Sequence, residues 1–250
     1  MQVLYIGDEK LNTRQFFVGV ESVQMVQRRV EDYRPLMDAL DPFDHIDIKH
    51  MHDPDILSSF PATPDELAEY DALIISDLTR DTLLPHFYPD AIPGPNRVKT
   101  IAEYVEQGGA LLYCGGWMTY QGYRGIGNWH GTPVADTLPI EIRPIFDDRV
   151  ESPEGSEITV YDPDHPIMAG IDWDDAPPLY GYNRTAGVKA GATHIADVAE
   201  SPLLAVDEHG DGRVMAYTSD PGPQWGKALH DWDGYPQFWR QALEWTTRSA

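Results

Sequence analysis

Residues 108–122 read Gly-Gly-Ala-Leu-Leu-Tyr-Cys-Gly-Gly-Trp-Met-Thr-Tyr-Gln-Gly and carry the clearest fold signal in the chain. The run 110–114 is apolar almost throughout, which is typical of a strand buried on both faces of a parallel sheet. A helical pattern over 97–107 ends at the two glycines directly before this strand. A helix, a buried strand and a glycine-containing loop in succession form the repeating unit of an α/β sheet.

The same unit recurs on both sides of this stretch. Buried apolar runs at 3–6 and 72–76 predict further strands, and residues 46–51 are expected to form another strand. An apolar stripe from Val23 to Leu40 predicts a helix over 21–40. We therefore expect an α/β fold with a mostly parallel central sheet, helices on both faces and an elaborated second half, in one domain spanning residues 1–250. In that second half we expect helices at 132–138 and 235–247, strands at 157–160, 193–198, 203–207 and 214–218, and a hairpin joining the last two strands.

The composition excludes several classes of function. The chain has 41 Asp and Glu residues against 18 Lys and Arg, a formal net charge of −23. Such a surface repels phosphate backbones and anionic lipids, so we expect no nucleic-acid partner and no membrane association. The N-terminal residues lack the pattern of a signal peptide, and no stretch approaches the ~20 apolar residues of a membrane helix. We expect a cytoplasmic protein.

A ligand site is expected where parallel strands end, because ligands of α/β sheets bind beyond the carboxyl ends of the strands. The loop 115–122 follows one predicted strand and the loop 220–225 follows another. In this prediction Gly115 and Gly116 offer backbone N–H groups, while Trp117 and Trp225 form walls. The aromatic walls suit a sugar-like ligand, and Arg124, just after the first loop, suits an anionic one. The alternative is that these aromatic side chains pack only against each other. The polar contacts would come from Gln121, Arg124, Asn183, Asp220 and Gln224.

A set of short motifs in a fixed order resembles the class I glutamine amidotransferase-like family, in particular its bacterial cytoplasmic branch. The resemblance covers nearly the whole chain and implies a flavodoxin-like α/β fold. The motifs include Gly115-Gly116-Trp117, Tyr120-Gln121-Gly122, His165-Pro166-Ile167-Met168, Gly181-Tyr182-Asn183, Thr218-Ser219-Asp220 and Trp232-Asp233-Gly234-Tyr235.

The resemblance implies a cysteine nucleophile on a Gly-x-Cys-x-Gly elbow, activated by a His–Glu pair. Cys114 has Leu112 where the first glycine belongs, and the better-matched register places Trp117 at the elbow. The position before Trp225, where the family implies a histidine, holds Gln224, and an amide cannot accept a proton from a thiol at neutral pH. We therefore expect no competent triad and expect Cys114 to be a buried strand residue.

Two histidines spaced two residues apart, His50 and His52, could chelate zinc. Solvated histidines at a strand end are the commoner arrangement, so we expect no metal and no cofactor.

Three hypotheses about function remain open. The first is an amidotransferase-like domain without glutaminase activity that binds a small molecule. The second is an active hydrolase or amidotransferase that uses Cys114 with a base such as His130 or His230. The third is a non-enzymatic module whose exposed aromatic residues form a homo-oligomer.

Overall fold

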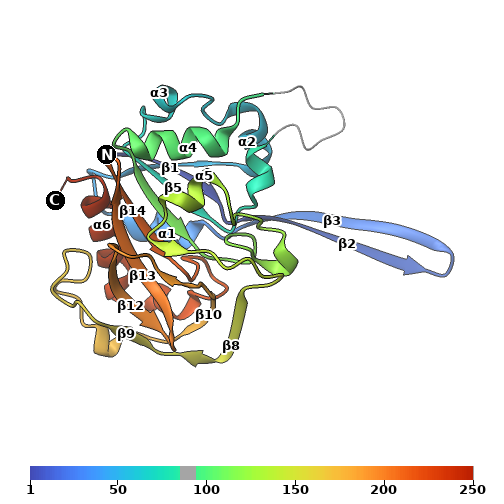
Figure 1. Ribbon diagram of the computed structural model, residues 1–250. Helices are drawn as coiled ribbons and strands as arrows, with labels where there is room; N and C mark the ends of the chain where they lie inside the picture. Colours follow the sequence, from blue (N-terminus) through green and yellow to red (C-terminus); the bar gives the residue numbers. More distant parts are fainter. Residues whose placement is uncertain (85–93, 250) are drawn as a thin grey trace.

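The computed structural model describes residues 1–84 and 94–249, apart from the side chains of residues 13–16, 18 and 21–28. An eight-stranded sheet forms its centre (Figure 1). The first five strands in sheet order are parallel neighbours, and the remaining three pair antiparallel. The order is β4 (Asp47–Met51), β1 (Gln2–Gly7), β5 (Ala72–Ser76), β6 (Ala110–Cys114), β14 (Gly212–Tyr217), β13 (Ser201–His209), β12 (Thr193–Val198) and β9 (Ile158–Val160).

Helices cover both faces of the sheet, which confirms the expected α/β architecture. The apolar residues of α1 (Arg34–Leu40) and α6 (Gly234–Thr246) pack on one face. The other face packs against α2 (Asp53–Ser59), α3 (Pro64–Leu67), α4 (Arg97–Glu106) and α5 (Pro133–Thr137). The strands are buried from both sides because apolar side chains alternate between these two cores.

The second half adds short elements around the sheet. They comprise the antiparallel pairs β8 (Arg149–Ser156) with β10 (Leu179–Asn183) and β7 (Ile140–Glu141) with β11 (Gly187–Val188), and the 3-10 turns η3 (Tyr123–Gly125), η4 (Trp173–Asp175) and η5 (Lys227–Asp231); a further turn, η1 (Arg80–Leu83), follows β5.

The helix predicted over 21–40 is wrong for residues 21–31. These residues form β3 (Glu21–Glu31), which pairs antiparallel with β2 (Glu9–Val18), and only the segment 34–40 is helical. Gly19, with a φ of 61°, and Val20 make the two-residue turn between the strands. Such a turn fixes the strand register, so hairpin pairing overrides the three-to-four spacing of the valines. The hairpin projects from the body of the molecule (Figure 1).

Candidate active-edge cavity

Carboxylates gather where the parallel strands leave the sheet. Asp8 follows β1, Asp77 follows β5 and Asp220 lies three residues after β14. All three are buried, with exposed fractions of 2%, 9% and 3%. Asp8 and Asp77 have positive φ values of 50° and 45°, a left-handed conformation that Asp tolerates better than most residues. The strand exits therefore turn sharply and bring charged groups together.

Burial controls the protonation of this group. Burial, and then the charge of Asp77, raises the pKa of Asp8 to about 7. Burial also raises the pKa of Asp77 and raises that of Asp220 well above its ordinary value, with Asp8 and Asp77 adding to the latter effect. Lys10 partly offsets the negative charge, since its ammonium group lies 2.8 Å from Asp32 and 3.5 Å from Asp77. The carboxyls of Asp32 and Asp77 thus both pair with Lys10.

The loop after β6 is held closed by its own hydrogen bonds. Asn183, which is fully buried, accepts from the Gly116 N–H at 2.9 Å and donates to the Gly116 carbonyl at 3.1 Å. The Gly115 N–H donates to the carbonyls of Tyr217 and Ser219, both at 2.8 Å. The expectation that the two glycines offer N–H groups to a ligand is therefore wrong, because protein acceptors already occupy both donors.

Asp148 adds further hydrogen bonds that hold the loop after β6. Its carboxylate accepts from the N–H groups of Gln121 and Gly122, both at 2.8 Å, and from the Asn183 amide at 2.9 Å. A buried carboxylate with three donors fixes the loop in one conformation.

An open cavity of about 620 Å³ lies beside the locked loop. Its wall combines the exits of β1 and β5 with the base of the β2–β3 hairpin. Carboxylates and neutral polar groups share this wall with one lysine, one tryptophan and four other apolar side chains. The lining residues are Glu9, Lys10, Asn12, Val30, Asp32, Asp53, Asp77, Leu78, Thr79, Thr82, Trp117, Met118, Ile126 and Gln224.

Asp53 is a further unusual group in this wall. Burial, and then the charges of Glu9 and Asp77, raises its pKa to about 7. Its Oδ1 atom is buried without a hydrogen-bond partner among the side chains that the structure describes.

Of the side chains predicted to form the site, Trp117 and Gln224 line this cavity. Trp225 is buried and donates to Glu151 at 3.2 Å, so it forms no wall. Arg124 is exposed and stacks on Tyr123. The remaining predicted polar residues, Gln121, Asn183 and Asp220, serve the loop geometry and do not line the cavity.

Cys114 faces the apolar core on the α6 side of the sheet and is fully buried. Burial raises the pKa of its thiol well above the ordinary value. Neither Cys114 nor Trp117 has the positive φ of a strained nucleophile elbow. The His230 ring contacts the Pro221 carbonyl at 2.9 Å, and His130 is exposed. Within residues 1–84 and 94–249, no hydrogen bond joins Cys114 to an imidazole.

Sequence reasoning missed Lys10, Asp32, Asp53 and Asp77 as cavity residues. Asp77 directly follows a buried strand, so the rule that singled out the loop after β6 would also have found it. Lys10 and Asp32 lie at the two ends of the hairpin, and they carry no signal when the hairpin itself is not predicted.

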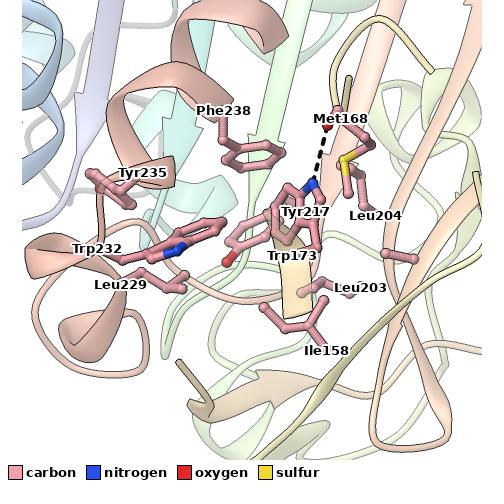
Figure 2. Close-up of a pocket in the computed structure, with 11 residues that line it drawn as sticks. Ile158, Met168, Trp173, Leu203, Leu204, Tyr217, Leu229, Trp232, Tyr235 and Phe238 are labelled. Atoms are coloured by element: carbon pink, nitrogen blue, oxygen red, sulfur yellow. Dashed lines mark hydrogen bonds between the residues drawn. The ribbon is translucent and has the colours of Figure 1, made fainter. Parts of the chain in front are cut away.

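A second cavity, between α6 and the antiparallel strands, is apolar (Figure 2). Trp173, Trp232, Tyr217 and Phe238 crowd around it, and the Trp173 indole N–H donates to the Met168 carbonyl at 3.3 Å. Its volume of about 10 Å³ is at the lower limit for one water molecule. It is a packing gap in the core and cannot hold a ligand.

Comparison with known proteins places these observations in a family. The family described as "Putative glutamine amidotransferase" matches residues 2–248. Two structures of cytoplasmic proteins from Salmonella typhimurium are each 31% identical and cover 98% of this chain and 99% of their own, with TM-scores of 0.91 and 0.90. A ThuA-like protein from Parabacteroides merdae, 10% identical with a TM-score of 0.54, covers 99% of this chain and 90% of its own and shares the fold alone. No protein with a curated description matches the sequence.

In residues 1–84 and 94–249, the structure contains no helix with the length and apolar character that crossing a membrane requires.

Replacing Asp220 with Asn tests whether burial raises the pKa of this carboxyl. Because the folded-state pKa of Asp220 is raised, its contribution to stability is present below the unfolded value near 4 and is lost as the pH rises through the folded pKa. Each unit of pKa difference corresponds to about 1.4 kcal/mol. We expect Asp220→Asn to raise the free energy of unfolding more at pH 8 than at pH 5, measured by urea denaturation.

The control is Asp231→Asn, at an exposed position. Parallel pH profiles for wild type and Asp220→Asn would contradict the assignment of a raised pKa.

Proposed function

The chain belongs to the glutamine amidotransferase-like family, and we propose that this member binds a small sugar-like molecule in the carboxylate-lined cavity without a competent glutaminase triad. The observation that carries the proposal is the contrast between two neighbouring places. The strand end at Cys114 is sealed in the core, whereas the exits of β1 and β5 border an open cavity with carboxylates in its wall.

The environment of Cys114 argues against the family's chemistry. A nucleophilic cysteine needs an accessible thiolate and a base within hydrogen-bond reach. Burial favours the neutral thiol of Cys114, and the ring of His230 is bound to a backbone carbonyl instead. The alternative of an active hydrolase using Cys114 would require the core around β6 to open.

The chemistry of the cavity favours a neutral, hydroxyl-rich ligand. Asp32 and Asp77 can accept hydrogen bonds from hydroxyl groups, and Lys10 can donate to a ring or hydroxyl oxygen. Trp117 lines the cavity and is half-buried, and Tyr123 and the Arg149 guanidinium stack against its ring. The part of the indole that remains exposed can contact the apolar face of a sugar ring. An anionic ligand fits less well, because Arg124 lies outside the cavity and four carboxyls line it.

We further propose that residues 1–250 act as one domain and that the protein is cytoplasmic. The cytoplasmic description of the two Salmonella proteins supports this location.

Ligand binding is tested with six methyl pyranosides, the α and β anomers of glucose, galactose and mannose, by saturation-transfer NMR at millimolar concentration. We expect at least one glycoside to bind. Trp117→Ala should weaken binding about fivefold, since an aromatic contact is worth on the order of 1 kcal/mol. Trp245→Ala, on α6 and outside the cavity, is the matched control.

Two results would reject a sugar-like ligand in this cavity. One is the absence of a saturation-transfer signal from all six glycosides. The other is equal affinity in wild type and Trp117→Ala.

Self-association is a second candidate property, favoured by the β2–β3 hairpin. A two-stranded hairpin is marginally stable by itself in water. Leu11, Phe17 and Val20 are 62%, 73% and 100% exposed on this hairpin, so it carries apolar surface that contact with a second copy of the chain would cover.

The native mass tests this candidate. We expect wild type to be dimeric by light scattering at 100 µM and the double variant Phe17→Ser, Val20→Ser to be monomeric. Phe146→Ser removes a phenylalanine that is equally exposed, at 72%, outside the hairpin and should remain dimeric. A monomeric wild type, or a dimeric double variant, would exclude the hairpin as the interface.

A further inference from the structure

Three potential metal ligands converge beside the cavity. Glu9 begins β2, His50 lies in β4 and His52 directly follows β4. One ligand atom from each residue lies within 4.8 Å of the other two. We propose that Glu9, His50 and His52 bind a divalent transition-metal ion, with Zn²⁺ as the best match to this donor set.

His50 is arranged as a metal ligand. Its Nε2 atom lies 2.8 Å from the Gly7 carbonyl, an acceptor, so the ring proton resides on Nε2. The lone pair is then on Nδ1, which is buried and has no hydrogen-bond partner among the described side chains. Tyr33 stacks on the ring at a centroid distance of 3.6 Å and fixes its plane. A carbonyl on one ring nitrogen and a free lone pair on the other is the usual state of a metal-binding histidine.

Glu9 is oriented in a comparable way. The Arg29 guanidinium lies 2.7 Å from its Oε1 atom, whereas Oε2 lies 3.0 Å from His52 Nδ1. The Glu9 side chain is only 6% exposed. Arg29 therefore anchors one carboxylate oxygen from outside and leaves the other directed toward the histidines.

His52 has two neighbours that make opposite demands on Nδ1. Glu9 Oε2 requires a proton there, whereas the Arg29 Nη1 atom, 3.2 Å away, requires a lone pair. One protonation state cannot satisfy both. A metal cation accepts the lone pairs of Glu9 and His52 together, and Arg29 can keep its bond to Glu9 Oε1.

The dimensions are compatible with zinc. With ligand bonds of about 2.0–2.2 Å, neighbouring ligand atoms of a tetrahedral site lie roughly 3.3 Å apart. The separation of 3.0 Å between Glu9 and His52 already approaches this value, and the limit of 4.8 Å leaves His50 only a small adjustment.

The position of the site connects it with the cavity. Two imidazoles and a carboxylate leave a fourth position for water or substrate, as in catalytic zinc sites. Glu9 and Asp53 belong to the cavity wall, so the ion would lie at that wall. The unpartnered Oδ1 of Asp53 is a second buried acceptor next to the site.

These contacts correct the expectation of solvated histidines for His50, whereas the His52 side chain is 38% exposed. The His50 ring stacks on Tyr33. The centroids of the His50 and His52 rings lie 5.5 Å apart, with an interplanar angle of 75°. The competing interpretation is an ion-pair network in which Arg29 alone balances Glu9.

The test uses the full-length protein, stripped with EDTA, and Zn²⁺ alone in isothermal titration calorimetry. We expect one ion per chain with a dissociation constant in the micromolar range or below. Glu9→Gln and His50→Ala should each weaken binding at least tenfold. Co²⁺ in place of Zn²⁺ should give the intense visible absorption of a tetrahedral site, and both variants should lose it.

His209→Ala is the matched control, because His209 pairs with Glu106 at 3.1 Å on the surface without a third ligand. It should bind Zn²⁺ like the wild type. Circular dichroism establishes that each variant is folded. Binding weaker than 100 µM, or binding that persists unchanged in Glu9→Gln and in His50→Ala, would overturn the proposal and leave the ion-pair network. The outcome does not depend on a sugar-like ligand.

Discussion

Parallel pairing of β1, β5, β6 and β14 is the constraint on which the rest of the structure depends. Strands that run the same way leave the sheet at the same edge, so the segments that follow them must share one small region. Here they bring Asp8, Asp77 and Asp220 close enough for the charge of Asp77 to raise the pKa of Asp8 and for both to raise the pKa of Asp220. Burying carboxyls costs stability unless they are paired or protonated. A cluster of buried carboxyls whose charge is balanced mainly by Lys10 is typical of a functional region.

The same edge contains two neighbouring places with different properties. After β6, Asn183 and Asp148 bind the backbone of the loop so completely that no donor of Gly115 or Gly116 faces a ligand. After β1 and β5, the chain opens into the cavity bordered by the hairpin base. The fold of the amidotransferase-like family is thus retained, and the function proposed above places the ligand at the exits of β1 and β5 instead of at the end of β6.

Much of the fold could be predicted from the sequence, because buried strands such as Ala72–Ser76 and Ala110–Cys114 are apolar on both faces and leave little ambiguity. The hairpin could not, since the valines of residues 21–31 fit a helical stripe as well as a strand and only Gly19 marked the turn. Because the hairpin was not predicted, Lys10 and Asp32 were not recognised as cavity residues. Trp117 and Gln224 were found because they lie in the loops that follow β6 and β14. Trp225 has the same position in the chain, but only tertiary packing against Gly181 buries it. The pairing of Glu9 with His52 depends on β1 and β4 lying side by side, a neighbourhood that no local pattern encodes.

The rate at which the single thiol reacts tests the central claim that Cys114 belongs to the core and not to a site. The measurement is labelling of Cys114 by an aromatic disulfide at pH 8, in native buffer and in 8 M urea. A buried thiol reacts only when the structure opens, so the account predicts native labelling slower than unfolded labelling by a factor on the order of 1,000 or more. Native labelling as fast as that of the unfolded chain would show an accessible thiolate at the end of β6 and would contradict the account.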